Sequence, residues 1–333
     1  MSRRRRARRN AGPGSTGGPG RSSFFAGLLA AVRHNRWVLA GILLGGGTAG
    51  GLIGLFFSAR NTASPRVVRD GAPAWSPDSR RIVFFSEHDG QGDIWVMNAD
   101  GSGATQLTDT RADEGYPWWS PDGATITFDS DRDDGFDIWA MDADGSNVRR
   151  LRRHAARDVA ASWSPDGRRI AFMSDRTGGF DVWVMDADGM NAVRVTETGT
   201  SWFPVFSPDG SRLAFHVGRD VHTMDAAGGP LTRLTADPAN GMVPSWSPDG
   251  RRIAFMSWRN GRTEIFVMNA DGTDQRVLVS MPSGDAIDPR WSPDGASIVF
   301  VHLPGGMQGE ERTIWRVDAD GGNLRRLSPE APR

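Results

Sequence analysis

The chain has 333 residues and no cysteine, which excludes disulfides and cysteine-ligated zinc and leaves packing as the source of stability. The formal net charge of −1 hides an asymmetry, because residues 1–60 carry ten arginines and no acidic residue, so the remainder stands at −11 by difference. A basic segment joined to an acidic body indicates two environments rather than one nucleic-acid-binding surface.

Residues 1–23 contain an arginine run, MSRRRRARRN, followed by AGPGSTGGPG and RSS. The arginines repel one another and the Gly/Pro/Ser run cannot bury a core, so we predict a disordered tail. No aromatic residue interleaves with the arginines, and we therefore expect no nucleic-acid partner.

Residues 37–57 read WVLAGILLGGGTAGGLIGLFF, a run of 21 residues without a charge. As a helix this run would be about 30 Å long, which matches the hydrocarbon thickness of a bilayer. The arginine excess precedes it, which predicts a cytoplasmic N-terminus and an extracytoplasmic body in a single-pass cell-membrane protein. The run exceeds the apolar region of a signal peptide, so we expect an uncleaved anchor. Residues 24–36 are predicted to be an interfacial segment and residues 58–65 a linker.

The predicted membrane helix is rich in glycine at four-residue spacing: Gly41 and Gly45, and Gly46, Gly50 and Gly54. Small residues at this spacing let two membrane helices approach closely, which predicts weak self-association. The other interpretation is that the glycines merely lower the hydrophobicity of the segment.

Residues 66–333 are organised by a repeat whose clearest copy is WSPDGRRIAFMS, starting at Trp163. The equivalent positions, which differ by 44, 44, 43, 40 and 45 residues, are Trp75, Trp119, Trp163, Phe206, Trp246 and Trp291. A period in the forties, made of short strand-like runs separated by turn signals, is typical of a propeller.

Each copy can be divided into four strands separated by turns. The first strand runs into the aromatic residue, and Ser-Pro-Asp-Gly then turns the chain. Second strands are predicted at 81–86, 125–130, 169–174, 212–217, 252–257 and 297–302. Third strands follow around Ile94, Ile138, Val182, Val221, Ile265 and Ile314, and a fourth, outer strand is predicted at 191–195 in the third copy. The fold class is therefore an all-β, six-bladed propeller, preceded by the disordered basic tail and one transmembrane helix.

A second aromatic series recurs in the third strands, at Trp95, Trp139, Trp183, Phe266 and Trp315, with His222 in its place in the fourth copy. We interpret both series as aromatic side chains packed in the core between neighbouring blades. The loop between the second and third strands is shortest in the fourth copy, at 218–220, and longest in the sixth, at 303–312. Residues 66–68 are expected to pair with the edge of the last blade and help to close the ring.

The string WSPDG-x-x-I-A-F-x-S, followed by D-I-W-V-M and A-D-G, resembles the TolB-type propeller repeat, and also the propellers of prolyl-oligopeptidase and dipeptidyl-peptidase relatives. The resemblance implies the fold over residues 66–329, but function resides in sites rather than folds. TolB proteins have an α/β domain before the propeller, where this chain has its predicted anchor. The peptidase relatives carry a hydrolase domain, and no G-x-S-x-G motif occurs here, so we expect no peptidase activity.

Candidate metal sites in the sequence are weak. The Asp-x-Asp-Gly turns starting at Asp142, Asp186 and Asp318 superficially resemble calcium loops but have no terminal glutamate, which favours tight turns. His216 and His222 are expected on facing strands, where a hydrogen-bonded structural role is favoured over a metal site. We therefore predict no metal, no cofactor and no catalytic residues.

The loops that enter the first strands are predicted to line one mouth of the central channel, where their side chains would converge. The proposed binding rim is acidic and would accept a protein or a basic peptide, or a cation. It comprises Asp70, Glu114, Trp118, Asp158, Trp202, Asn240 and Asp285, with Ser201 beside them. The other interpretation is that these are ordinary solvated loop residues.

The function predicted from the sequence is a membrane-anchored, extracytoplasmic, non-catalytic protein- or peptide-binding scaffold. The alternatives are a lyase or hydrolase that uses channel-mouth carboxylates, with or without a metal ion, and an envelope-integrity role without a defined ligand.

Overall fold

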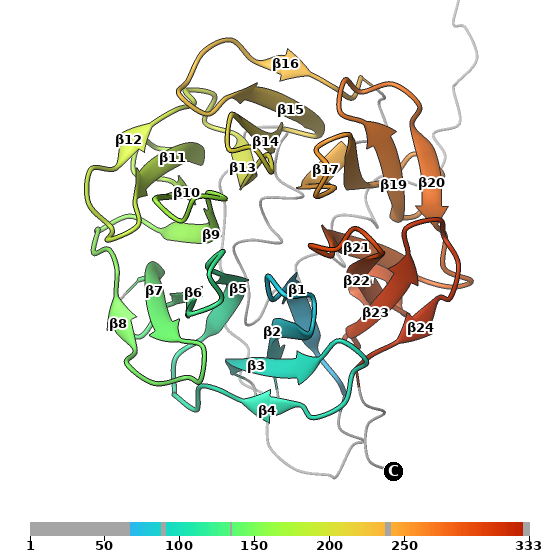
Figure 1. Ribbon diagram of the computed structural model, residues 1–333, viewed down its shortest axis with the longest axis horizontal. Helices are drawn as coiled ribbons and strands as arrows, with labels where there is room; N and C mark the ends of the chain where they lie inside the picture. Colours follow the sequence, from blue (N-terminus) through green and yellow to red (C-terminus); the bar gives the residue numbers. More distant parts are fainter. Residues whose placement is uncertain (1–66, 88–90, 134, 237–240, 329–333) are drawn as a thin grey trace, which may run out of the picture.

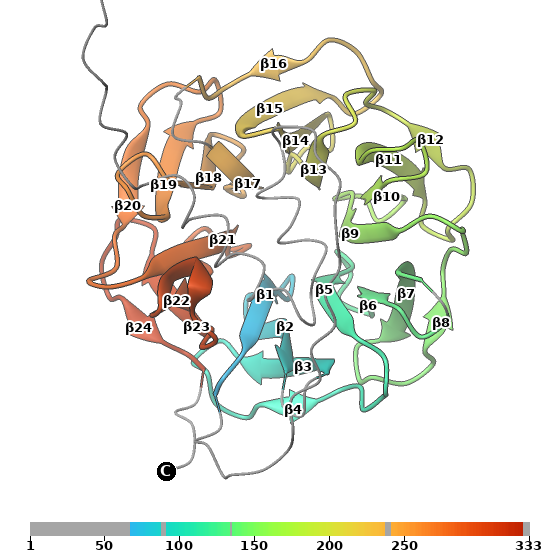
Figure 2. The ribbon, with the colours of Figure 1, turned by 180° about the vertical axis from the view of Figure 1, so that it is seen from behind.

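The computed structural model describes residues 67–87, 91–133, 135–236 and 241–328. These residues form six four-stranded antiparallel sheets arranged around one axis (Figure 1), and the view from behind shows the same ring (Figure 2). The prediction of an all-β, six-bladed propeller is confirmed. The tail, the interfacial segment, the membrane helix and the linker predicted over residues 1–65 lie outside the described residues, as does Arg66. Within the described ranges, no helix has the length and apolar character needed to cross a membrane.

The innermost strand of each blade ends at the repeat aromatic residue. These strands are β1 (Asp70–Trp75), β5 (Glu114–Trp119), β9 (Asp158–Trp163), β13 (Ser201–Phe206), β17 (Gly241–Trp246) and β21 (Asp285–Trp291). The second strands are β2 (Arg81–Glu87), β6 (Thr125–Ser130), β10 (Arg169–Ser174), β14 (Arg212–Val217), β18 (Arg252–Ser257) and β22 (Ser297–Leu303). The second strands agree with the predicted ranges to within one residue.

The third and fourth strands complete each blade toward the outside of the ring. The third strands are β3 (Gly92–Asn98), β7 (Asp137–Asp142), β11 (Asp181–Asp186), β15 (Asp220–Asp225), β19 (Glu264–Asn269) and β23 (Thr313–Asp318). The outer strands are β4 (Thr105–Gln106), β8 (Arg149–Arg150), β12 (Val193–Arg194), β16 (Thr232–Arg233), β20 (Arg276–Val279) and β24 (Arg325–Arg326). The outer strand of the third blade is shorter than the predicted 191–195, because only two of its residues pair with β11. One 3-10 helix, η1 (Gly306–Gln308), lies in the long loop of blade six.

Second strands supply the core between the blades. The phenylalanine of each I-A-F-like run is at most 2% exposed, in the series Phe84, Phe128, Phe172, Phe215, Phe255 and Phe300. Burying one such side chain contributes about 1.5–3 kcal/mol, so these six positions account for a large part of the cohesion between blades.

The Ser-Pro-Asp-Gly turn is held by its own side chains, as the sequence predicted. In the third blade Ser164 Oγ donates to Asp166 Oδ1 at 2.6 Å, and the Arg168 N–H donates to the same oxygen at 3.1 Å. Gly167 closes the turn at φ +69°, a left-handed conformation that favours glycine.

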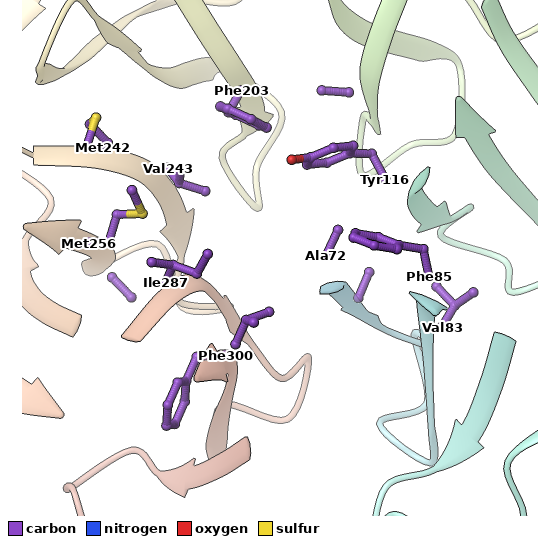
Figure 3. Packing of buried hydrophobic residues seen from close by; sticks show 14 of the residues in the cluster. Ala72, Val83, Phe85, Tyr116, Phe203, Met242, Val243, Met256, Ile287 and Phe300 are labelled. Carbon is purple, nitrogen blue, oxygen red and sulfur yellow. The ribbon is translucent and has the colours of Figure 1, made fainter. Parts of the chain in front are cut away.

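Each inner strand contains a bulge three residues before the aromatic residue that ends it. The bulged residue has a left-handed φ between 43° and 55° in the series Ala72, Tyr116, Ala160, Phe203, Val243 and Asp288. The register against the second strand shifts at the same point. Tyr116 and Phe203 point toward one another near the axis (Figure 3), with ring centroids 5.5 Å apart. The cavity at this level is only about 20 Å³, room for about one water molecule.

The ring closes without exchanging a strand between the first and last blades. The Arg312 N–H donates to Val68 O at 2.8 Å and the Asp70 N–H donates to Arg312 O at 3.1 Å. The segment before β1 therefore pairs with the end of the β22–β23 loop, which corrects the expected pairing with the edge of the last blade. Ser79 stands at φ +60° where the other copies have glycine, and its Oγ accepts the Asp294 N–H at 3.1 Å across the same junction.

The two histidines of blade four lie in different environments. His216 is 0% exposed, its Nδ1 accepts the Val243 N–H at 3.4 Å, and its ring stacks on Phe203. His222 lies opposite Phe215, and its Nδ1 lies 2.9 Å from Asp220 O. Burial lowers the pKa of His216 to about 3, so the ring is neutral near pH 7.

Blades three and five have methionine, Met173 and Met256, at the position equivalent to His216. We expect His216→Met to make the free energy of unfolding fall less as the pH is lowered. Below the unfolded pKa of about 6.5, the unfolded chain binds a proton that folded His216 refuses until about pH 3. His216 therefore lowers the free energy of unfolding by up to about 1.4 kcal/mol per pH unit in this window. Urea unfolding of both proteins at pH 7.5, 6, 5 and 4 measures the difference. Parallel pH profiles for the two proteins would contradict this assignment.

Candidate functional site

The acidic residues predicted to form a rim are buried at the start of the inner strands. The exposed fractions of Asp70, Glu114, Asp158 and Asp285 are 3%, 1%, 0% and 7%. Their backbone position is as expected, but their side chains turn into the blades. The prediction of a rim of open carboxylates therefore needs correction.

Blade three shows why these acids are buried. Asp158 accepts two hydrogen bonds from Arg176, at 2.7 and 2.8 Å, and Arg176 also donates to Ser174 Oγ at 2.9 Å. The guanidinium of Arg176 lies 4.3 Å from the ring centroid of Trp183. The acid, the S-x-R sequence and the third-strand aromatic thus form one unit inside the blade.

The same unit recurs in blade two, where Glu114 pairs with Arg132 and Arg132 stacks on Trp139 at 4.4 Å. Burial raises the pKa of Glu114, and the Thr108 hydroxyl and Arg132 oppose this rise. In blade five Gly241 replaces the acid, and Arg259 instead donates to Gln275 Oε1 at 2.9 Å.

The remaining rim residues do not converge on one mouth. Asp70 accepts hydrogen bonds from the hydroxyls of Ser86 and Ser328, both at 2.6 Å. Trp202 is 8% exposed and packs on Phe180, with ring centroids 4.4 Å apart. Ser201 is also buried.

Trp118 belongs to the opposite end of the channel, near the Ser-Pro-Asp-Gly turns, where the guanidinium of Arg290 lies 5.3 Å from its ring. Asn240 lies outside the described residues. Among the described residues of the predicted rim, Trp118 lines a cavity at the turn end of the channel, whereas Asp285 lines a cavity at the end where the inner strands begin.

A cleft of about 520 Å³ lies between blades five and six, at the end where the inner strands begin. Its apolar lining comes from β17, β18 and η1 with their adjoining loops, and comprises Met242, Met256, Trp258, Pro304 and Met307. Met242 and Met256 are cross-strand partners (Figure 3), and Trp258 is 39% exposed.

Asp285 holds the wall of this cleft together. Its Oδ1 accepts the Thr263 N–H at 2.6 Å and its Oδ2 accepts the Met307 N–H at 2.9 Å. The carboxylate therefore ties the β18–β19 loop to η1. Gly306 permits this approach, because a Cβ at this residue would lie 3.0 Å from Asp285 Oδ2.

The side chains that edge the cleft are cationic. Arg219 is exposed, whereas Arg262 donates to Met281 O at 2.8 Å and to Ser280 Oγ at 2.7 Å, and its Nε lies 3.5 Å from Glu264 Oε1. Because the Asp285 carboxylate is engaged by backbone N–H groups and Arg262 is engaged by its neighbours, the cleft offers an apolar surface beside the exposed guanidinium of Arg219.

Sequence reasoning missed Trp258, although the repeat carried a signal. The second residue of the S-x-R sequence is Asp131 in blade two and Asp175 in blade three, where each carboxylate accepts a backbone N–H from the loop before its inner strand. In blade five this residue is Trp258, so an aromatic side chain stands where the repeat has a carboxylate.

The turns that resemble calcium loops are closed by hydrogen bonds. Asp144 Oδ1 accepts from both the backbone N–H and the hydroxyl of Ser146, at 2.9 and 2.6 Å. Among the described residues, no group of three or more histidine, aspartate or glutamate side chains could hold a metal ion.

Comparisons with known proteins agree with this geometry. The family model for the TolB beta propeller domain (PD40) matches residues 57–151, 132–203 and 197–331. No curated protein matches the sequence. The structure resembles TolB from Acinetobacter baumannii at 20% identity and a TM-score of 0.68, covering 77% of this chain and 65% of that protein.

Two enzymes contain similar propellers. An oligogalacturonate lyase in complex with manganese matches at 16% identity and a TM-score of 0.55, over 79% of this chain and 77% of the lyase. A puromycin-hydrolyzing peptidase of Mycobacterium tuberculosis matches at 15% identity and a TM-score of 0.56, over 80% of this chain and 55% of the peptidase. At such identities these likenesses show the fold alone.

We expect Arg176→Met to lower the free energy of unfolding by about 1.5–3 kcal/mol, because it removes two charged hydrogen bonds to the buried Asp158 and leaves this carboxylate only Arg152, whose Nε lies 3.3 Å from Oδ2. Urea unfolding measures the change. Arg168→Met, at an exposed arginine of the adjacent turn, is the matched control and should change stability by less than about 0.5 kcal/mol. Equal losses in the two variants would show that the Arg176 pair has no special structural role.

Proposed function

The chain belongs to the TolB beta propeller domain family, and from this premise we propose that it is a non-catalytic binding module. It holds a segment of a partner protein in the cleft between blades five and six. The observation that carries this proposal is the exposed Trp258, which stands beside methionines at a position where blades two and three have an aspartate. Exposed aromatic residues in well-formed clefts are the side chains that dominate many protein interfaces.

The lining indicates the chemistry of the partner segment. Methionine side chains are flexible and polarizable, so Met242, Met256 and Met307 can adapt to an apolar side chain. Arg219 at the edge favours a carboxylate next to that side chain. The partner segment is therefore apolar with an adjacent acidic residue, rather than the basic peptide expected from the sequence.

A lyase or hydrolase that uses channel-mouth carboxylates remains the alternative from the sequence. The carboxylates chosen for that role are engaged: Asp158 by Arg176, Asp70 by two hydroxyls, and Asp285 by two backbone N–H groups. These contacts favour a structural role for the acids, and we therefore propose binding rather than catalysis. The peptide selection described below distinguishes this binding function from an envelope-integrity role, because a protein without a ligand should select no peptides.

We further propose that residues 37–57 anchor the propeller at the outer face of the cell membrane. The support is the 21-residue uncharged run and the arginine excess that precedes it. The partner would then be an extracytoplasmic protein.

We expect Trp258→Asp, which restores the residue type of blades two and three, to weaken partner binding at least about 10-fold while leaving stability nearly unchanged. A random peptide library displayed on phage is selected against the full chain, and the affinities of the selected peptides are measured by calorimetry. The selected peptides should combine an apolar residue with an adjacent acid.

The matched control is Met190→Asp, because Met190 is a 61% exposed apolar residue in the turn before β12. It should bind the selected peptides as the unaltered chain does. Recovery of no peptides, or of peptides that bind both variants equally well, would overturn the proposed site.

We expect the full chain to remain in the membrane pellet after alkaline carbonate extraction, and protease added to intact cells to digest the propeller. A variant with Leu43→Arg and Leu44→Arg in the predicted helix should be released, because each arginine at the centre of a span costs about 2.5–3.5 kcal/mol. Release of the unaltered chain, or protection of its propeller from protease, would contradict the proposed topology.

A further inference from the structure

Five of the six junctions between blades share an arginine stacked on an aromatic ring. The ring belongs to the residue that ends an inner strand, and the arginine comes from the preceding blade. The guanidinium-to-centroid distances are 4.7 Å for Arg81 on Trp119, 5.3 Å for Arg169 on Phe206, 5.9 Å for Arg212 on Trp246, 4.7 Å for Arg252 on Trp291 and 5.5 Å for Arg316 on Trp75.

The junction between blades two and three is the exception. The position of the stacking arginine is taken by Thr125, and within the described part of the chain no arginine stacks on Trp163. The five covered rings are 3–9% exposed, whereas Trp163 is only half-buried. The ring of Trp163 therefore lacks the arginine that covers the other five, although it packs against the core that contains Phe172.

The ring of Trp163 is fixed in place although its face is open. Its Nε1–H donates to Thr127 Oγ1 at 3.2 Å, which holds the indole by its edge. Trp163 lines both the cavity of about 310 Å³ at the turn end of the channel and a cleft of about 750 Å³ between blades two and three.

The surroundings of this face are acidic. Asp122, Asp166 and Asp188 line the cleft. Hydrogen bonds from Ser120 and Ser164 lower the pKa of Asp122 and Asp166, so both carboxylates are ionised at neutral pH.

Two arginines also line the cleft. Arg150 is engaged by Asp133 and Asp137 and stacks on Trp139 at 5.0 Å, and Arg149 is exposed. Among the residues that line the cleft, three carboxylates outnumber the one arginine, Arg149, that is not paired with Asp133 or Asp137, and the charge of the lining favours a cation. Arg168 and Arg169 lower the pKa of Asp166 but do not line the cleft.

We propose that Trp163 and the carboxylates around it bind the guanidinium of an arginine from a partner peptide, which completes the sixth stack from outside the chain. The planar guanidinium matches the contact made at the other five junctions, and an aromatic face with nearby carboxylates is the environment in which such a cation binds. The site lies at the turn end of the channel and is independent of the cleft that contains Trp258.

The test uses the full chain with ¹⁵N-labelled tryptophan, titrated with the capped tripeptide Gly-Arg-Gly and with its neutral isostere Gly-citrulline-Gly. The indole resonance of Trp163 is assigned from a Trp163→Phe variant. We expect a saturable shift of this resonance with the arginine peptide, and binding of the citrulline peptide at least 10-fold weaker. Trp258→Asp should leave the shift unchanged.

Two further variants make the proposal falsifiable. Thr125→Arg should supply the missing stack within the chain, raise Tm by about 1–3 °C and abolish the shift. Arg81→Thr should uncover Trp119 and add a second indole that responds to the peptide. Equal shifts with the two peptides, a shift that persists in Thr125→Arg, or a shift too weak to saturate would each overturn the proposal.

Discussion

Every blade of this protein has two apolar faces, and it can bury them only against its neighbours. The ring therefore depends on six junctions that must be filled together, including the one between the last blade and the first. The junctions share a buried phenylalanine from the second strand and, in five cases, an arginine stacked on the next blade's aromatic residue. The contact is kept even where the residues differ. Blade six has Ser297 in place of the arginine, and Arg316 from β23 donates to Ser297 Oγ and reaches Trp75 instead.

The same dependence on packing explains why the acidic residues that begin the inner strands are buried and paired. Asp158 begins an inner strand deep in the sheet, where an unpaired carboxylate would be costly. Its arginine partner, Arg176, follows 18 residues later at the end of the next strand, and Glu114 and Arg132 have the same spacing. Asp129 serves a different need, because its carboxylate accepts the N–H of Ala160 in the bulge of the neighbouring blade at 2.9 Å. Acids that look like a binding rim in the sequence are therefore part of the scaffold.

The sequence predicted the parts of the structure that depend on local chemistry. The Ser-Pro-Asp-Gly turn closes through Ser164 and Asp166 only two residues apart, so the turns and the second strands could be placed almost to the residue. The burial of Asp158 was missed because it depends on which way one side chain turns within a sheet, although its spacing to an arginine was visible. The cleft was missed for a stronger reason. It forms because Asp285 ties η1 to the loop before β19, and no local pattern places Trp258 beside Met307.

A repeat protein offers an internal standard for separating structural from functional residues. A residue type that fills the same position in most blades is explained by the blade. A departure that another residue compensates is also structural, as when the hydroxyl of Ser79 replaces a glycine and accepts the Asp294 N–H across the closing junction. Thr125 and Trp258 are different, because each leaves an aromatic surface open to solvent where its counterparts support the ring or a loop. Exposed aromatic surface in a cleft is typical of interaction sites, so these two departures are the positions at which we propose that a partner binds.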